Sequence, residues 1–164
     1  MRETTLIADN QKVLAILKSI ESFRPFSDEH LQSFLTVGKL CEYDPEETII
    51  QEGDTDTWMY FLLAGEIEIV KNDTQIKILR RSGELFGEMG VVDGAPRSAS
   101  IRSLTKVLLL GVDGSLIEKK HQKNELAFGY TMFRLFTEIL VERLRLTTQD
   151  NIKLREELDA LKNK

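Results

Sequence analysis

The sequence predicts an α+β protein in which a small antiparallel β-barrel of the jelly-roll type has helices before and after it. Apolar residues recur at helical spacing up to about residue 38, and with a period near two from Leu40 to residue 112. Helical spacing then returns from about Leu126. Because evenly spaced short strands are typical of sandwiches and jelly rolls, we divide the 164 residues into N-terminal helices (1–38), a barrel (39–112) and C-terminal helices (113–164).

Two N-terminal helices are expected to pack on the barrel. Asp9 or Asn10 can cap the first, and Arg24-Pro25 ends it because a residue before proline avoids helical backbone angles. Ser27 can cap the second, which closes near Gly38. The two apolar faces consist of Val13, Leu14, Leu17 and Ile20, and of Leu31, Phe34 and Leu35.

Seven short strands are predicted within the barrel. Turn residues such as Asp44-Pro45, Gly53-Asp54, Asn72-Asp73 and Ser82-Gly83 separate most of them. The expected strand ranges are 40–43, 47–51, 57–63, 66–71, 75–80, 98–104 and 106–112.

The C-terminal region predicts a short helix over 114–120, capped by Asp113, and a long helix from about Leu126 to the end. The last part of the long helix carries a heptad repeat. Its a positions are Leu144, Asn151 and Leu158, and its d positions are Leu140, Thr147, Leu154 and Leu161.

This heptad predicts a homodimer through the C-terminal helix. A single asparagine at a, here Asn151, favours a parallel, in-register pair. Opposite charges also meet across the seam, from Asp150 to Arg155 and from Glu157 to Lys162 of the partner subunit. The alternative is an amphipathic helix lying on its own barrel, which we expect for the part before Leu140.

The segment 83–102 combines glycines, one acid and one arginine in a pattern that favours a phosphate next to a sugar hydroxyl. Gly87 and Gly90 flank Glu88 and allow close approach of the backbone, and about one helical turn is expected after Gly87. Arg97 supplies a planar cationic fork for a phosphate, and the small residues Ser98 and Ala99 can present backbone N–H groups. An ionised Glu88 would accept a hydrogen bond from a hydroxyl.

Phe-Gly-Glu, followed after nine positions by Arg97 with proline before it and Ser-Ala after it, closely resembles the phosphate-binding cassette of the cyclic-nucleotide-binding domain family. Gln51-Glu52-Gly53-Asp54 and Met59-Tyr60-Phe61 resemble the barrel of the same family. The resemblance implies that Glu88 binds the ribose 2′-hydroxyl and that Arg97 binds the cyclic phosphate. The candidate cassette contacts are Gly87, Glu88, Met89, Gly90, Arg97, Ser98 and Ala99.

Residues 142–148 resemble the dimer helix of the catabolite-activator branch of that family. The resemblance implies that Arg143 pairs with the cassette glutamate. It also implies that Thr147 and Thr148 reach the adenine amino group, one from each subunit. This chain has Thr-Thr where the branch has Thr-Ser. The alternative therefore remains that the two threonines are polar residues tolerated in the dimer seam and make no contact with a ligand. The implied ligand is cyclic AMP, with cyclic GMP possible.

Composition narrows the classes of function. The net charge of −5 and pI near 5.2 disfavour a nucleic-acid surface, and the chain carries no DNA-reading helix-turn-helix, so no DNA binding is expected. A lone Cys41 and the lack of a long apolar run predict a cytoplasmic protein with no membrane association. No nucleotide-hydrolase loop, nucleophile elbow or metal-ligand spacing is present, so we expect no enzyme activity.

Two functions remain open from the sequence. One is a small-molecule sensor that binds cyclic AMP and signals through its dimer helices to an effector that the sequence does not identify. The other is a coiled-coil assembly module, or a regulatory fragment of a larger protein, with a vestigial pocket. The intact set of Glu88, Arg97, Ser98 and Ala99 favours the sensor.

Overall fold

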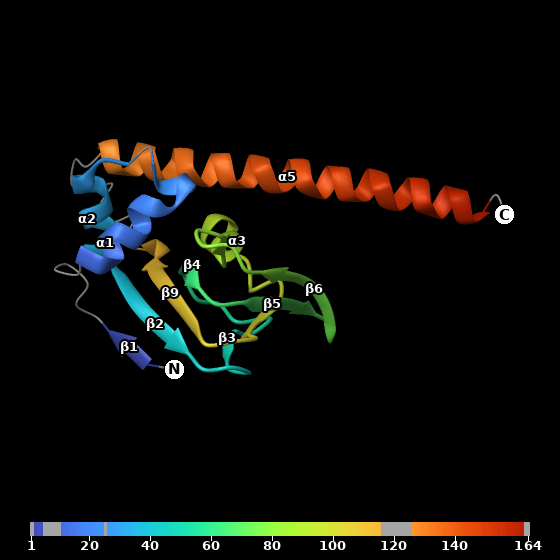
Figure 1. Cartoon of the computed structure of the whole chain (residues 1–164), viewed down its shortest axis with the longest axis horizontal. Helices are drawn as coiled ribbons and strands as arrows, with labels where there is room; N and C mark the ends of the chain where they lie inside the picture. Colours follow the sequence, from blue (N-terminus) through green and yellow to red (C-terminus); the bar gives the residue numbers. More distant parts are fainter. Residues whose placement is uncertain (1, 5–10, 25, 116–125, 163–164) are drawn as a thin grey trace.

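The computed structural model describes residues 2–4, 11–24, 26–115 and 126–162 and confirms the α+β jelly-roll prediction (Figure 1). Two antiparallel sheets form the body, and helices α1 (Gln11–Ser19) and α2 (Asp28–Val37) lie at one end of it. The short 3₁₀ helix η1 (Glu21–Phe23) connects them. Helix α5 (Leu126–Lys162) runs over the body and continues well beyond it.

The two sheets are interleaved along the chain. The five-stranded sheet has the order β1 (Arg2–Thr4), β2 (Gly38–Tyr43), β9 (Val107–Asp113), β4 (Trp58–Ala64) and β7 (Leu85–Phe86). The four-stranded sheet has the order β3 (Thr48–Ile50), β8 (Ser100–Ser103), β5 (Ile67–Lys71) and β6 (Thr74–Leu79). Strand β9, the last strand in the chain, pairs with β2 on one side and with β4 on the other. The end of the barrel sequence thus lies between two strands from its first half.

Strand β4 is buried on both faces over most of its length, which explains its nearly continuous apolar run. Met59, Phe61 and Leu63 point to one side and join a core with α1, α2 and Leu135 of α5. Tyr60 and Leu62 point to the other side and pack inside the barrel. Because successive side chains of a strand point to opposite faces, every second side chain of β4 packs against the helices and the others pack against the opposite sheet.

Most predicted elements are confirmed where the structure describes them. Ser27 caps α2 by accepting a hydrogen bond from the His30 N–H, and Asn72 and Asp73 adopt the left-handed angles of a tight hairpin between β5 and β6. The predicted caps Asp9 and Asn10, and most of the helix expected over 114–120, lie outside the described residues. Strands β1 and β7 were not predicted, because each has only two or three residues.

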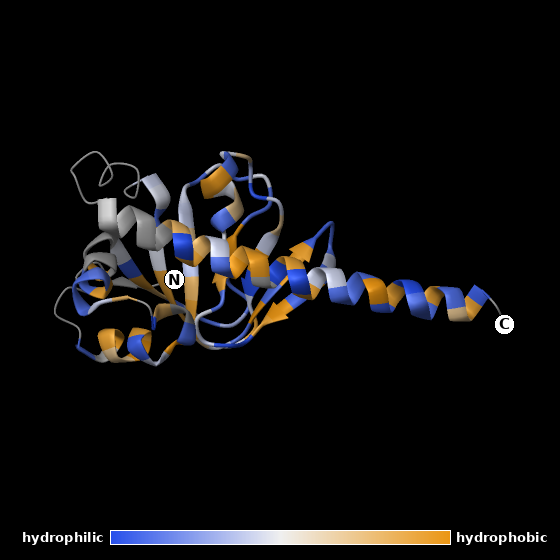
Figure 2. Cartoon of the chain, turned by 90° about the horizontal axis from the view of Figure 1, so that it is seen from above, coloured by the Kyte–Doolittle hydropathy of each residue, from blue (hydrophilic) through white to orange (hydrophobic). Residues whose placement is uncertain are grey.

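Before Leu140, helix α5 lies against the body, and it makes this contact with residues beside the heptad seam and not with the seam itself. Leu135 is buried and Phe136 and Ile139 are half-buried against the body, whereas Phe133, which continues the heptad seam, is 71% exposed. The seam residues with described side chains are therefore exposed from Phe133 onward, and Figure 2 shows apolar residues recurring along the projecting part of the helix. No helix in the described ranges is long and apolar enough to cross a membrane.

Candidate ligand-binding site

The cassette is a short helix held between two left-handed glycines. Helix α3 (Glu88–Asp93) follows β7 directly, which confirms the helical turn predicted after Gly87. Gly87 precedes the helix with φ 77°, and Gly94 follows it with φ 66°. The Gly87 carbonyl, directly before Glu88, accepts a hydrogen bond from Arg97, so the two ends of the cassette lie close together.

Gly87 is expected to tolerate no side chain, whereas Gly94 should tolerate one better. A Cβ at Gly87 would lie 3.0 Å from both Arg97 Nη1 and the Trp58 carbonyl oxygen, while nothing lies within 4 Å of a Cβ at Gly94. Both positions carry the left-handed strain. We expect Gly87→Ala to lower the free energy of unfolding by about 2–4 kcal/mol and Gly94→Ala by about 1 kcal/mol. Urea unfolding of the two variants checks this, and equal losses would show that backbone strain alone matters.

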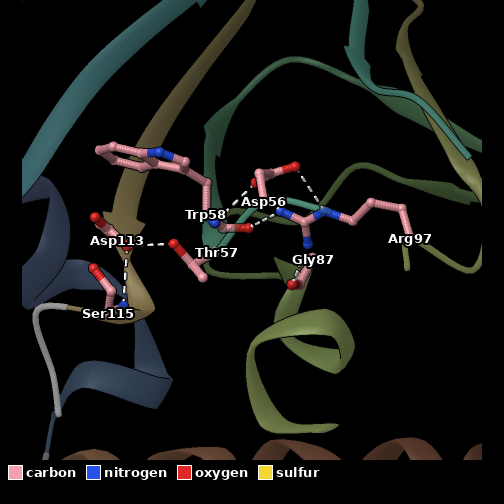
Figure 3. Close-up of polar contacts among 7 residues, drawn as sticks. All are labelled: Asp56, Thr57, Trp58, Gly87, Arg97, Asp113 and Ser115. Atoms are coloured by element: carbon pink, nitrogen blue, oxygen red, sulfur yellow. Dashed lines mark hydrogen bonds and ion pairs between the residues drawn. The ribbon is translucent and has the colours of Figure 1, made fainter. Parts of the chain in front are cut away.

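Arg97 is buried, with 4% exposure, and is held by three protein groups (Figure 3). Its Nε donates to Asp56 Oδ2 at 3.0 Å, and Nη2 donates to Asp56 Oδ1. Nη2 also donates to the Trp58 carbonyl, and Nη1 donates to the Gly87 carbonyl at 2.5 Å. Four of the five N–H donors of the guanidinium are thus used, which leaves one on Nη1 for another acceptor.

Sequence reasoning missed Asp56 as the partner of Arg97. The two residues are 41 positions apart, and Asp56 stands in an acidic loop where nothing distinguishes it from Asp54 or Glu52. The backbone explains the meeting, because the Arg97 N–H donates to the Asp54 carbonyl at 2.8 Å and the Gly53 N–H donates to the Arg97 carbonyl at 2.9 Å. Arg97 is consequently fixed at both its backbone and its guanidinium.

The pKa of Asp56 lies below its ordinary value. Burial alone would raise the pKa, but hydrogen bonds from Arg97 and from the Trp58 N–H, together with the Arg97 charge, lower it by more. A carboxyl whose pKa is lowered by folding stabilises the folded state above its unfolded pKa, and this contribution is lost as the pH falls through the folded pKa.

Asp56→Asn is therefore expected to make the stability of the folded state depend less on pH in the acidic range. Between pH 6 and about pH 3, the melting temperature of the wild type should fall more steeply than that of the variant, because only the wild type must protonate Asp56. Thermal unfolding followed by circular dichroism at several pH values measures this. Asp54→Asn in the same loop serves as the control, and parallel curves for Asp56→Asn and the wild type would contradict the prediction.

Glu88 is buried, with 3% exposure, and contacts the long helix. Arg143 of α5 donates through Nη1 to Glu88 Oε1 and through Nη2 to the Leu85 carbonyl. The structure thus brings together the pair that the sequence resemblance implied, across 55 positions. One residue of α5 touches both the first residue of α3 and strand β7, so helix and cassette are mechanically connected.

The remaining candidate residues divide into two groups. Met89, Gly90, Ser98 and Ala99 lie on the cassette with Arg97, and the Ser98 hydroxyl approaches the Met89 sulfur at 4.0 Å. Thr147 and Thr148 are exposed on the projecting helix. The Thr148 hydroxyl donates to the Leu144 carbonyl within α5, so within one chain the threonines make no described contact with the cassette.

Trp58 and Asp113 brace the strand ends beside Arg97 (Figure 3). The Thr57 hydroxyl donates to Asp113 Oδ1 at 2.6 Å, and the Ser115 N–H donates to the same oxygen at 3.0 Å. The Lys39 ammonium lies 3.9 Å from the centre of the Trp58 ring. These contacts fix residues 56–58, which supply two of the groups that hold Arg97, the Asp56 carboxylate and the Trp58 carbonyl.

Among the described residues, the buried polar side chains are Glu88, Arg97 and Ser103, so two of the three lie in the cassette. Ser103 is accounted for by the Asp44 and Glu47 backbone. The cassette of this jelly-roll protein thus combines a buried acid and a buried arginine, each of them ion-paired.

Comparison with known proteins identifies the family of this domain. The family described as the cyclic nucleotide-binding domain matches residues 40–124, just over half of the chain. The cGMP-dependent protein kinase of Plasmodium berghei is 26% identical over 166 residues, which cover 92% of this chain and 19% of the kinase. The cAMP-dependent protein kinase regulatory subunit of Aspergillus fumigatus is 36% identical over 99 residues, 58% of this chain and 23% of the subunit.

A solved cyclic nucleotide-binding domain from Methylobacillus flagellatus is similar in fold, with a TM-score of 0.77 at 21% identity. The similarity covers 90% of this chain and 85% of that one. The chain spans less than a fifth of the length of the Plasmodium kinase. This protein belongs to the cyclic nucleotide-binding domain family.

Proposed function

We propose that the protein is a non-catalytic sensor that binds a 3′,5′-cyclic nucleotide at the cassette and signals through a dimer of α5. The observation that carries the proposal is the buried pair of Glu88 and Arg97 on a short helix flanked by glycines. Arg97 has one N–H left for a phosphate oxygen, and Ser98 and Ala99 follow it with small side chains. Relatives named for cyclic AMP and for cyclic GMP both support the ligand class.

Thermal unfolding with and without nucleotide tests the proposal. At a ligand concentration about 100 times the dissociation constant, binding adds about 2.7 kcal/mol and should raise the melting temperature by roughly 5–10 °C for a chain of this size. Cyclic AMP and cyclic GMP are the ligands, and 5′-AMP is the control that lacks the cyclic phosphate. If millimolar cyclic nucleotide leaves the melting temperature unchanged, the assembly-module alternative, which the exposed seam of α5 favours, replaces the sensor.

The heptad supports a site shared between two subunits. Arg143 occupies a g position, and in a parallel dimer its neighbour across the seam is the e position five residues later, Thr148 of the partner subunit. Since Arg143 holds Glu88, such a dimer would place the partner's Thr148 beside the cassette. This placement supports the preference for cyclic AMP and the likeness to the catabolite-activator branch that the sequence predicts.

Removing both hydroxyls, by Thr147→Val with Thr148→Val, should reduce discrimination between the two nucleotides. Each hydrogen bond to the base contributes about 0.5–1.5 kcal/mol, so the preference for cyclic AMP should shrink while the phosphate contribution remains. Calorimetric titrations of cyclic AMP and cyclic GMP on wild type and variant measure this. An unchanged ratio of affinities would mean that the threonines belong to the dimer seam alone.

A further inference from the structure

Thr57 stands between the two residues that hold the Arg97 guanidinium from the side opposite the cassette helix. Asp56 supplies the carboxylate and Trp58 the carbonyl that accept hydrogen bonds from it. The Trp58 N–H also donates to Asp56 Oδ1 at 2.9 Å, so the two partners of the guanidinium are bonded to each other. A contact that orients Thr57 therefore orients both of these groups.

The end of strand β9 holds Thr57 at its side chain and at its backbone. Asp113, the last residue of β9, accepts the Thr57 hydroxyl through Oδ1 at 2.6 Å (Figure 3). The Gly114 N–H donates to the Thr57 carbonyl at 2.8 Å. An O–H donor that meets a carboxylate at such a distance makes a charge-assisted bond, which is stronger than a bond between neutral groups. Thr57 is thus fixed to the strand end beside it.

The same carboxylate oxygen also holds the first residues after the barrel. Asp113 Oδ1 accepts the Ser115 N–H at 3.0 Å, which is the bond that a helix N-cap makes. Gly114 and Ser115 have helical backbone, and they lie between the barrel and α5 in the chain. One oxygen atom therefore connects Thr57 with the start of the C-terminal segment.

These bonds form a continuous path from the cassette to the end of the barrel. It begins at the Gly87 carbonyl, which accepts from Arg97 Nη1, and passes through the guanidinium and Thr57 to Asp113. It shares no residue with the contact between Glu88 and Arg143, which joins the cassette to α5 directly.

We propose that Asp113 is a positioning residue for the ligand that the cassette binds. Through the Thr57 hydroxyl it fixes the groups that orient Arg97. Through the Ser115 N–H it transmits the occupancy of Arg97 to the segment that leads to α5. An arginine that is already ordered binds a phosphate more tightly, because the ligand need not order it. The inference rests on the proposed function for the identity of the ligand.

Thr57→Val tests the positioning, because it removes the hydroxyl at nearly constant size. Calorimetric titration of the folded variant should show cyclic-nucleotide binding about three- to tenfold weaker, the effect of losing one hydrogen bond. Thr105→Val is the matched control. Thr105 is also exposed, its hydroxyl oxygen accepts from the Glu66 N–H at 2.9 Å, and it precedes β9, at the opposite end of the strand from Asp113. Equal affinities of the two valine variants would overturn the proposal.

Two substitutions of Asp113 test whether the effect passes through Thr57. Asp113→Asn keeps an acceptor oxygen and should bind within about threefold of the wild type, whereas Asp113→Ala should bind as weakly as Thr57→Val. In the Thr57→Val background, Asp113→Ala should weaken binding less than it does in the wild type, because part of its effect is the loss of the same bond. Full additivity, or equal losses from Asn and Ala, would refute the route through the Thr57 hydroxyl.

Amide hydrogen exchange tests the transmission. Saturating cyclic nucleotide should slow exchange of the Ser115 amide in the wild type and in Thr105→Val, and less so in Thr57→Val. Equal slowing in the two variants would refute a connection through Asp113.

If the wild type binds no cyclic nucleotide, the proposed function fails, and the positioning is decided without ligand. The Arg97 Nε–H, which donates to Asp56 Oδ2, should exchange with solvent faster in Thr57→Val than in Thr105→Val when followed by NMR. Equal exchange rates would show that Asp113 does not position Arg97.

Discussion

Arg97→Ala is expected to weaken cyclic-nucleotide binding by roughly 2–5 kcal/mol, mostly through faster dissociation. The reason is geometric as well as electrostatic. Arg97 is buried, and its orientation is fixed by Asp56 and two backbone carbonyls before any phosphate arrives. A ligand therefore meets a pre-oriented cation in a site of low dielectric constant. Glu88→Ala should cost less, about 1.5–3 kcal/mol, as one lost charge-assisted hydrogen bond.

The measurement needs a check on folding, because Arg97→Ala also removes a structural brace. The Asp56 side chain is 42% exposed, so water can replace part of the lost ion pair, but the carbonyls of Gly87 and Trp58 lose a donor. Arg97→Lys keeps the charge without the fork and should retain the fold better. Arg102→Ala, in the exposed part of β8, is the matched control. Wild-type affinity in Arg97→Ala, measured by calorimetry on folded protein, would refute the assignment of the cassette.

Leu154→Lys is expected to convert a dimer of this chain into monomers. Leu154 is at a d position and is 61% exposed in the single chain, so the substitution costs the monomer little. In a coiled coil it removes two buried leucines and opposes two charges, a loss of at least about 3–6 kcal/mol per dimer. The association constant should fall by a factor of roughly 10² to 10⁴. Sedimentation equilibrium over a range of concentrations measures it.

Ile152→Lys is the matched control. Ile152 is similarly exposed, at 53%, but stands at a b position away from the seam. It should leave the association constant within a few fold of the wild type. A Leu154→Lys variant that associates as well as Ile152→Lys would show that the heptad is not the interface. Asn151→Leu should strengthen association but loosen the register.

The sequence predicted those parts of the fold that depend on local pattern. Ser27 as a helix cap, the Asn72-Asp73 hairpin and the apolar strand Trp58–Ala64 each follow from chemistry within a few residues. Strand β1 did not, because its three residues become a strand only by pairing with Glu42, Cys41 and Leu40 of β2.

In the candidate site, too, the sequence predicted the residues of the local motif but not all of their distant partners. Its glycines and charged residues form a spaced motif, and the resemblance also pointed to the Glu88–Arg143 contact. The Asp56–Arg97 pair depends on how the loop at residues 53–54 docks on the Arg97 backbone, which no local pattern encodes. Periodicity likewise shows that α5 has an apolar seam, but the face that packs on the body, with Leu135 and Ile139, is decided by the shape of the body.

Helix α5 also has the proportions of a lever. The Arg143–Glu88 contact is its attachment to the cassette, and the helix continues to Lys162, about 28 Å further at 1.5 Å per residue. A tilt of about 10° around that attachment would displace the far end by roughly 5 Å, although the guanidinium itself moves by only a fraction of an ångström. Such a tilt would convert a sub-ångström rearrangement at one ion pair into a displacement close to the rise of one helical turn, roughly 5.4 Å. The displacement of the far end is proportional to the length of helix beyond Arg143. Shortening α5 by whole heptads from its C-terminal end would therefore reduce that displacement in proportion and leave the Arg143–Glu88 contact unchanged.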